Sequence, residues 1–194
     1  MQDDPIRIVG EQILSDAHAP LKTVTFEQRR RDGRWQRERR EVYVNAGGAA
    51  VLLYDPLRRT VLLTRQFRIG AHLAGHDGFV IEAPAGMLDD ADPQQRVHAE
   101  LCEETGYRAR TVREVLRFFP NPSSLTEIVH CFLGEYEAGD RVGAGGGKAE
   151  EGEDIEVIEF QLDAALRMMR EGEIVDGKTV ILLLCLQQEL MVDG

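Results

Sequence analysis

Three glutamates lie close together near the middle of the chain, at the end of a segment with helical spacing. The segment reads GMLDDADPQQRVHAELCEETGY from Gly86 to Tyr107 and contains Glu100, Glu103 and Glu104. Residues spaced i, i+3 and i+4 share one face of a helix, so the three carboxylates are expected to point the same way. Carboxylate oxygens are ligands that Mg²⁺ or Mn²⁺ accepts more readily than zinc does. The spacing therefore predicts a divalent-cation site.

The element that positions these acids is predicted to be a helix of roughly three turns, from about Pro93 to Thr105. Pro93 suits the first helical position, Asp92 can cap the N-terminus, and Gly106 can end the helix in a left-handed conformation. Each acid in the last turns opposes the helix dipole at a cost of about 0.3–1 kcal/mol, and the acids also repel one another. A bound cation would offset both the unfavourable dipole and the repulsion between the acids. The alternative interpretation is an acidic helix end that is exposed to solvent and binds no metal.

Strand patterns dominate the rest of the chain. Asp32–Gly33 predicts a hairpin turn between residues 21–30 and 35–44, and apolar strands are expected at 48–55 and 60–67. Further strands are predicted at 110–119, 126–137 and 155–161, and helices at 162–172 and 177–190. Helices that occur singly among strands favour an α+β or α/β sandwich over a doubly wound parallel sheet.

The composition argues against several classes of protein. A net charge of −11 disfavours nucleic acid as a partner, although residues 29–40 form an arginine-rich patch. The longest apolar run, VILLLCL, is too short to span a bilayer, and the N-terminal residues lack the apolar core of a signal peptide. Three cysteines without CxxC spacing predict buried, reduced thiols rather than disulfides or a zinc site. We therefore expect a cytoplasmic protein with no membrane partner.

The stretch ELCEETGY and the glycine before it resemble the Nudix box, the signature of Mg²⁺-dependent hydrolases that cleave nucleoside diphosphates linked to another group. Three departures stand out: the spacing from Gly86 is one residue shorter than usual, Asp92 replaces a glutamate, and Ala99 replaces an arginine. In the family that arginine orients the glutamates by ion pairing. We hypothesise that Arg96, one helical turn before Glu100, takes this part.

Other segments extend the resemblance over nearly the whole chain, among them ILSD, REVY, TVLLTRQFR, TEIVHCFLGEY and GEIVDGKTVILLL. They are similar to the nucleoside-diphosphate-sugar branch, most of all to GDP-mannose pyrophosphatases and more distantly to ADP-ribose pyrophosphatases. The resemblance implies an α/β Nudix fold, an α/β/α sandwich with a mixed sheet over residues 46–194. It also implies an N-terminal antiparallel β subdomain over residues 1–45, which serves dimerisation and forms part of the substrate site of a homodimer.

The same resemblance implies residue roles. The expected metal ligands are the Ala85 carbonyl and the carboxylates of Glu100, Glu103, Glu104 and Glu153. The expected catalytic residues are Glu104 and two acids of the glycine-rich loop, Glu151 and Glu153, whose roles the sequence does not separate. The expected substrate contacts are His18, Arg39, Arg40, Glu41, Arg68, Ala85, Gly86, Met87, Glu104, Glu127 and Lys178.

Three functions remain open at this point. The first is Mg²⁺-dependent hydrolysis (with Mn²⁺ as a possible substitute) of GDP-mannose to GMP and mannose 1-phosphate. The second is the same reaction on ADP-ribose or another ADP-sugar. The third is a catalytically weak Nudix-fold sensor of nucleotide sugars, which Ala99 and the shortened box favour and the retained glutamates oppose.

Overall fold

The computed structural model describes residues 4–88 and 92–192. By their contacts, the residues divide into a smaller unit, which runs to Gly47 and includes Phe119–Ile128, and a larger unit formed by the rest. Within the smaller unit, the Tyr43 amide donates to the Ser124 carbonyl over 2.9 Å, which attaches the returning segment. The domain boundary expected between residues 45 and 46 stays a prediction.

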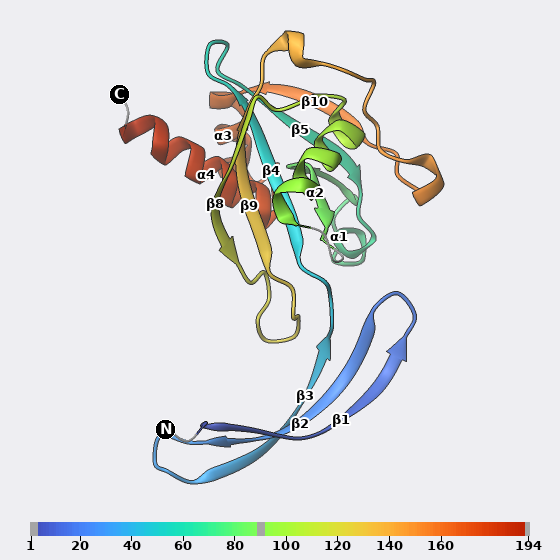
Figure 1. Cartoon of the computed structure of the whole chain (residues 1–194), viewed down its shortest axis with the longest axis vertical. Helices are drawn as coiled ribbons and strands as arrows, with labels where there is room; N and C mark the ends of the chain where they lie inside the picture. Colours follow the sequence, from blue (N-terminus) through green and yellow to red (C-terminus); the bar gives the residue numbers. More distant parts are fainter. Residues whose placement is uncertain (1–3, 89–91, 193–194) are drawn as a thin grey trace. The chain divides into compact units, whose positions relative to one another are not determined.

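The smaller unit is a three-stranded antiparallel sheet in the order β1-β2-β3 (Figure 1). Its strands are β1 (Ile6–Asp16), β2 (Pro20–Arg29) and β3 (Trp35–Tyr43). The predicted hairpin turn is present, with Gly33 at a φ of 86° that favours glycine. β1 lies at the edge of this sheet and exposes several large apolar side chains: Ile8, Val9, Ile13 and Leu14.

The larger unit is built on a mixed sheet of seven strands. Five of them follow the order β10 (Glu156–Gln161), β5 (Thr60–Phe67), β4 (Gly48–Asp55), β9 (Val129–Glu135) and β8 (Thr111–Phe118). β6 (Phe79–Glu82) pairs with β5, and the short β7 (Ala85–Met87) pairs with β4. β4 and β9 run parallel, whereas the other pairs are antiparallel.

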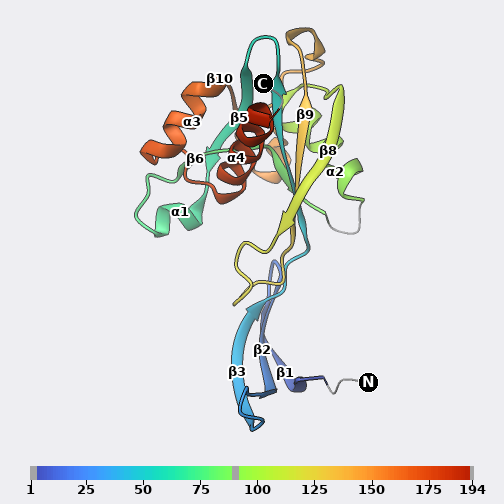
Figure 2. The ribbon, with the colours of Figure 1, turned by 90° about the vertical axis from the view of Figure 1, so that its left-hand side faces the viewer.

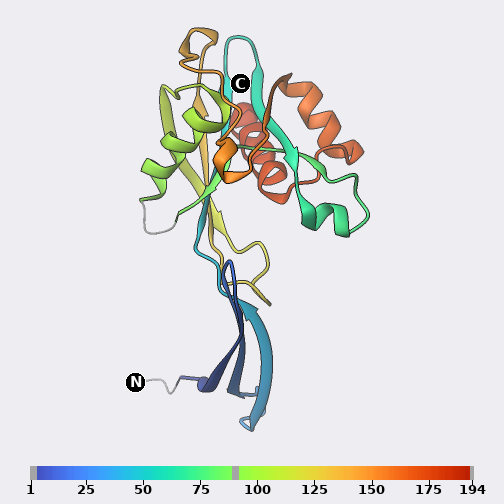
Figure 3. The same cartoon turned by 90° about the vertical axis from the view of Figure 1, so that its right-hand side faces the viewer.

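Helices cover both faces of this sheet. α2 (Pro93–Glu100) and the π-helix η1 (Leu101–Thr105) lie on one side, and α3 (Leu162–Glu171) and α4 (Gly177–Val192) lie on the other (Figures 2 and 3). Three short helices complete the unit: α1 (Ile69–Leu73), η2 (Ala138–Asp140) and η3 (Ala149–Glu151). The arrangement is an α/β/α sandwich, as the sequence predicts.

The central strand β4 explains why its sequence is apolar at nearly every position. Alternate residues face opposite sides of a strand, and both sides of β4 are buried. Ala50, Leu52 and Tyr54 belong to the core that includes α3 and α4, whereas Ala49, Val51 and Leu53 belong to the core that includes α2. The strand thus fixes the position of both helical layers.

Two sequence-based exclusions can be compared with the described residues. No described helix is long and apolar enough to cross a membrane. All three cysteines are free thiols, but only Cys131 is buried, because Cys102 and Cys185 each keep part of their surface exposed. The prediction of buried thiols is therefore wrong for two of the three. Burial raises the pKa of Cys131 to about 12, which makes that thiol a poor nucleophile.

Candidate active site

The acidic helix forms where the sequence predicts it, with a wider last turn. The Asp92 carboxylate accepts the backbone amides of Gln94 and Gln95 over 3.0 and 3.1 Å, which caps α2. The α-helix passes directly into the π-helix η1, which ends at Gly106 with a φ of 72°. One-turn π segments recur at functional sites because they shift the side chains that follow.

Two of the three clustered glutamates are buried. Glu100 is 5% exposed and Glu104 is 2% exposed, whereas Glu103 remains partly exposed. Burial raises the pKa of Glu100. Burial, followed by the charges of Glu100, Glu82 and Glu153, raises the pKa of Glu104 to about 8, against a smaller opposing effect from a backbone hydrogen bond of Ala85. The surroundings of Glu100 and Glu104 therefore disfavour the charged form of both carboxylates.

One buried oxygen of this cluster has no partner. Glu104 Oε2 is fully buried and makes no hydrogen bond among the described residues. An unpartnered carboxylate oxygen inside a protein is costly unless a cation or donor reaches it. The charges that act most strongly on Glu104 are those of other carboxylates, so the missing group is expected to be positive. This observation makes the cluster a fitting site for a hard divalent cation.

The strand β7 lies directly against the acidic helix. A Cβ atom added to Gly86 would overlap the Glu100 carboxylate, so only glycine allows this approach. The backbone of Ala85, the residue before it, lies near enough to Glu104 to act against the rise in the pKa of that carboxyl. The strand that carries Ala85 and Gly86 thus lies beside the buried carboxylates, while Met87 is exposed, and the expected contacts of all three residues with metal or substrate stay predictions.

The glycine-rich loop GGGKAEEGED, residues 145–154, is attached to the end of the acidic helix. Gly146 and Gly147 donate their amides to the carbonyls of Glu104 and Glu103 over 2.8 and 3.1 Å. Residues Gly145–Gly147 all have positive φ, between 72° and 106°, which explains the run of glycines. These bonds satisfy carbonyls that a helix end leaves unpaired.

This loop brings a base and an acid to the helix. Lys148 Nζ lies 2.8 Å from Glu103 Oε2, and the Lys148 amide donates to Glu153 Oε2 over 2.8 Å. The structure does not describe the side chain of Glu151, so its place relative to Glu153 stays a prediction. Among the described residues, no three His, Cys, Asp or Glu side chains are already arranged around a metal position. The carboxylates lie in one region, but Glu100 and Glu103 form ion pairs with Arg96 and Lys148.

A buried glutamate that the sequence analysis missed connects two predicted substrate-binding residues. Glu82, at the end of β6, is 2% exposed and accepts a hydrogen bond from Arg68 Nε over 2.7 Å. Its other oxygen lies 3.7 Å from Lys178 Nζ. The available signal was one acid at the end of the apolar stretch FVIE, where a charge needs a specific partner.

The structure divides the predicted site residues between the two units. The larger unit holds Arg68, Ala85, Gly86, Met87, Glu100, Glu103, Glu104, Glu151, Glu153 and Lys178. The smaller unit holds His18, Arg39, Arg40, Glu41 and Glu127, and all of these except Glu127 are exposed. Arg40 forms an ion pair with Glu38 in β3. The contribution of the smaller unit to a substrate site stays a prediction.

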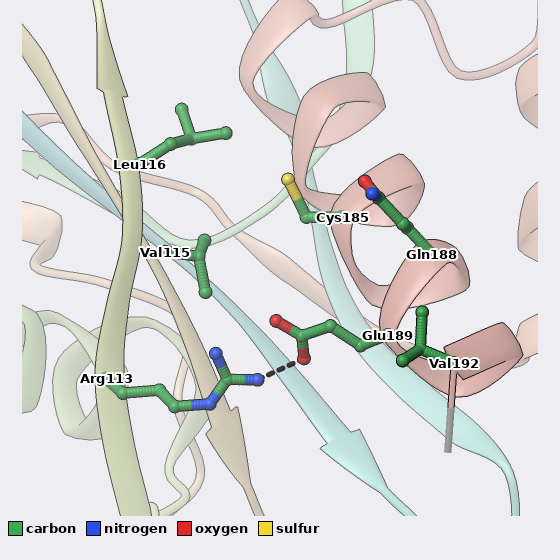
Figure 4. A pocket seen from close by; sticks show the side chains of 7 residues that line it. All are labelled: Arg113, Val115, Leu116, Cys185, Gln188, Glu189 and Val192. Carbon is green, nitrogen blue, oxygen red and sulfur yellow. Dashed lines mark hydrogen bonds and ion pairs between the residues drawn. The ribbon is translucent and has the colours of Figure 1, made fainter.

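A separate cavity of about 590 Å³ lies between β8 and α4 (Figure 4). An ion pair between Arg113 and Glu189 crosses it, and Leu116, Val115 and Cys185 line one end. None of the predicted site residues belongs to its lining. The carboxylates and cations that could act on a diphosphate are found elsewhere in the larger unit.

Comparison with known proteins places both parts of the chain. Residues 5–43 match the family described as the GDP-mannose pyrophosphatase NudK N-terminal domain, and residues 44–179 match the NUDIX domain. The chain is 42% identical over 189 residues to a GDP-mannose pyrophosphatase of Salmonella paratyphi B (strain ATCC BAA-1250 / SPB7), covering 97% of this chain and 98% of that protein. A GDP-mannose pyrophosphatase of Escherichia coli O157:H7 gives the same identity and coverage.

A solved structure supports the fold. The crystal structure of an ADP compounds hydrolase superposes with a TM-score of 0.73, covering 97% of this chain and 96% of that one. At 13% identity, this likeness shows the fold alone. The predicted resemblance and fold class are confirmed, since the mixed seven-stranded sheet with helices on both faces and the N-terminal three-stranded sheet are both present. The chain belongs to the Nudix hydrolase family.

Proposed function

We propose that this protein hydrolyses the diphosphate bond of GDP-mannose, yielding GMP and mannose 1-phosphate, in a reaction that needs Mg²⁺. The similarity to GDP-mannose pyrophosphatases extends over nearly the full length of both chains, including the N-terminal sheet. The structural observation that carries the proposal is the unpartnered oxygen of Glu104, buried beside Glu100 at the end of the acidic helix. An unpartnered buried carboxylate is costly to keep unless a cation binds it, so its retention favours a metal-dependent enzyme.

The proposed metal ligands are the Ala85 carbonyl and the carboxylates of Glu100, Glu103, Glu104 and Glu153. When bound there, the cation would neutralise charge on the diphosphate and lower the pKa of a water molecule. Mn²⁺ has the same ligand preference and could replace Mg²⁺. The π turn and the attached glycine loop hold these side chains within one small region, which reduces the rearrangement that binding requires.

A loop glutamate is proposed to accept the proton of the attacking water. Glu153 already lies beside Lys148 and close enough to Glu104 to raise its pKa. Glu151 is the other candidate for this role. The guanidinium of Arg68 would bind diphosphate oxygens and offset the charge that develops in the transition state, because its planar fork matches such oxygens. Lys178 would bind the sugar-phosphate portion.

We also propose that the protein acts as a homodimer in which the smaller unit of one subunit completes the other's substrate site. Five large apolar side chains of the edge strand β1 are exposed, which is unusual for a strand whose own edge is unpaired. His18, Arg39, Arg40 and Glu41 would contact the nucleotide across the dimer, and Glu127 would add a further contact. A cytoplasmic location is proposed, since the three cysteines are free thiols.

Phosphorus NMR of the products tests the reaction. Purified protein with Mg²⁺ and GDP-mannose is expected to give equal amounts of GMP and mannose 1-phosphate, and the variant Glu104→Gln should give neither. Binding of GDP-mannose without turnover, with Mg²⁺ or with Mn²⁺, would instead identify a nucleotide-sugar sensor. Release of GDP and free mannose would show that a different bond is cleaved.

A further inference from the structure

Glu82 holds two cations at once. Its Oε1 accepts a hydrogen bond from Arg68 Nε over 2.7 Å, and its Oε2 lies 3.7 Å from Lys178 Nζ. The carboxylate is almost completely buried, whereas the side chains of Arg68 and Lys178 are 45% and 25% exposed. Glu82 is therefore inaccessible to a ligand, whereas a ligand can reach Arg68 and Lys178 from solvent.

A second carboxylate holds Lys178 from the other direction. Asp176, just before α4, has Oδ1 at 2.7 Å from Lys178 Nζ. Its Oδ2 accepts hydrogen bonds from both the amide and the hydroxyl of Thr179, over 2.9 and 2.7 Å. With its second oxygen bound in this way, Asp176 cannot turn without breaking the first turn of α4. The ammonium group of Lys178 is thus held beside the start of that helix.

Thr179 connects this helix to the strand that leads to the acidic cluster. Its fully buried hydroxyl oxygen accepts the Ala83 amide over 2.7 Å. Ala83 follows Glu82 in the chain and lies two residues before Ala85, whose carbonyl is a proposed metal ligand. One continuous set of hydrogen bonds and ion pairs therefore links β6, the start of α4 and the backbone beside Glu104.

We propose that Glu82 and Asp176 are positioning residues that hold Arg68 and Lys178 as a single diphosphate-binding unit. This inference rests on the proposed function and names the residues that prepare its phosphate site. Arginine and lysine each lose considerable side-chain entropy when a ligand immobilises them. Two carboxylates that hold the cations before binding reduce this loss. Arg68 contacts Glu82 through Nε, so this contact does not use the terminal nitrogens of the guanidinium, which can donate to a diphosphate.

Simple electrostatics makes the opposite prediction, which allows a sharp test. A negative charge near a diphosphate repels it, so removal of the charge on Glu82 should strengthen anion binding if Glu82 does no positioning. If Glu82 and Asp176 position the two cations, the variants Glu82→Gln and Asp176→Asn should bind diphosphate more weakly. Both replacements keep the size and shape of the side chain. Glu156→Gln is the matched control, because Glu156 pairs with Arg65 on the neighbouring strand and is largely exposed.

The first measurement is calorimetric binding of inorganic pyrophosphate in the presence of Mg²⁺, which needs no turnover. We expect about tenfold weaker binding in Glu82→Gln and in Asp176→Asn, and wild-type binding in Glu156→Gln. Equal or tighter binding in both variants would overturn the proposal. If wild-type protein binds pyrophosphate and the variants weaken it, yet no nucleotide sugar is hydrolysed, the positioning role stands and the proposed function fails.

The second measurement separates positioning from general stability. With GDP-mannose, Glu82→Gln should raise KM about tenfold while kcat falls less, and Glu82→Gln added to Arg68→Ala should change KM by less than about twofold. Residues that act through one another are non-additive in this way. A full tenfold effect in both backgrounds would show that Glu82 does not act through Arg68. If Glu82→Gln fails to fold, Asp176→Asn with Lys178→Ala provides the same comparison.

Discussion

Arg96 Nη2 lies 2.5 Å from Glu100 Oε1, one helical turn along α2. The pair is largely buried, with 27% of the arginine side chain and 7% of the glutamate side chain exposed. Ala99 occupies the position where the Nudix box has an arginine that orients the glutamates. Ala99 cannot form an ion pair with these glutamates, and Arg96 forms one from the preceding helical turn. Its partner, Glu100, is a proposed metal ligand.

Replacing Arg96 is expected to weaken Mg²⁺ binding without abolishing it. Partners that orient metal ligands change affinity by roughly 10–100-fold, so we expect Arg96→Ala to lower Mg²⁺ affinity by about tenfold in a calorimetric titration. Arg167→Ala is a suitable control, because Arg167 and Glu171 form an exposed pair with the same i, i+4 spacing. Unchanged Mg²⁺ affinity in Arg96→Ala would leave Arg96 without an orienting role.

A methyl group at Gly86 should disable the site with little effect on the fold. The new Cβ atom would overlap the Glu100 carboxylate, so either the carboxylate or β7 must move. We expect Gly86→Ala to reduce kcat/KM by at least about a hundredfold, because small misplacements of this kind have large effects on catalysis. Gly139→Ala, where the added atom meets nothing within 4 Å, should retain wild-type activity. Comparable activities of the two variants would contradict the close approach.

The raised pKa of Glu104 predicts how stability of the metal-free protein depends on pH. The pKa of Glu104 is about 8 in the folded protein and 4.5 in the unfolded chain. Between these two pH values the folded protein keeps the proton on Glu104, whereas the unfolded chain releases it. Stability is then lost as the pH rises from about 4.5 to about 8. In EDTA, Glu104→Gln should therefore unfold at a temperature several degrees above wild type at pH 8, and at nearly the same temperature at pH 5.

Added Mg²⁺ gives the complementary result for this pair of proteins. The cation should raise the unfolding temperature of wild type at pH 8 by binding only the native state, and should have little effect on Glu104→Gln. Glu156→Gln, with an exposed carboxylate, should follow wild type throughout. A wild-type protein more stable than Glu104→Gln in EDTA at pH 8 would show that another group compensates the buried charge.

The exposed apolar side chains of β1 predict a dimer that a charge can disrupt. Ile8 and Ile13 are 60% and 57% exposed on the edge strand of the smaller unit. We expect Ile8→Glu with Ile13→Glu to convert a dimer to a monomer, measured by sedimentation, and to reduce turnover of GDP-mannose. Leu57→Glu is the control, since Leu57 is 84% exposed in the turn between β4 and β5. A wild-type protein that sediments as a monomer would contradict the proposed homodimer.

The helix that carries the acids was predictable because its signals are local. Asp92, Pro93 and Gly106 each act within a few residues, and each does so in the structure. The π turn was not predictable, because no capping residue or proline within the helical segment marks where it begins. The amides of Gly146 and Gly147 bind its last carbonyls, and no pattern within residues 93–106 specifies that the loop returns there.

The buried ionic contacts show the same division. Helical spacing predicts the pairing of Arg96 with Glu100, and the structure contains this ion pair. Pairing of Glu82 with Arg68 and Lys178 joins three segments, and the sequence contains only the hint of an isolated acid in an apolar strand. The ion pair between Lys148 and Glu103 is likewise not predictable from the sequence. Only the folded chain shows which carboxylates are paired with a protein cation before metal binds.

Competition between two substrates tests the central claim most directly. Wild-type protein with Mg²⁺ would be given GDP-mannose and ADP-ribose together at equal concentrations, and the initial rates of GMP and AMP formation would be measured by chromatography. In competition the ratio of rates equals the ratio of kcat/KM values, which reports discrimination alone. We expect GMP to form at least about tenfold faster than AMP, and we expect Glu104→Gln to form neither product. Faster AMP formation, or no formation of either product, would contradict it.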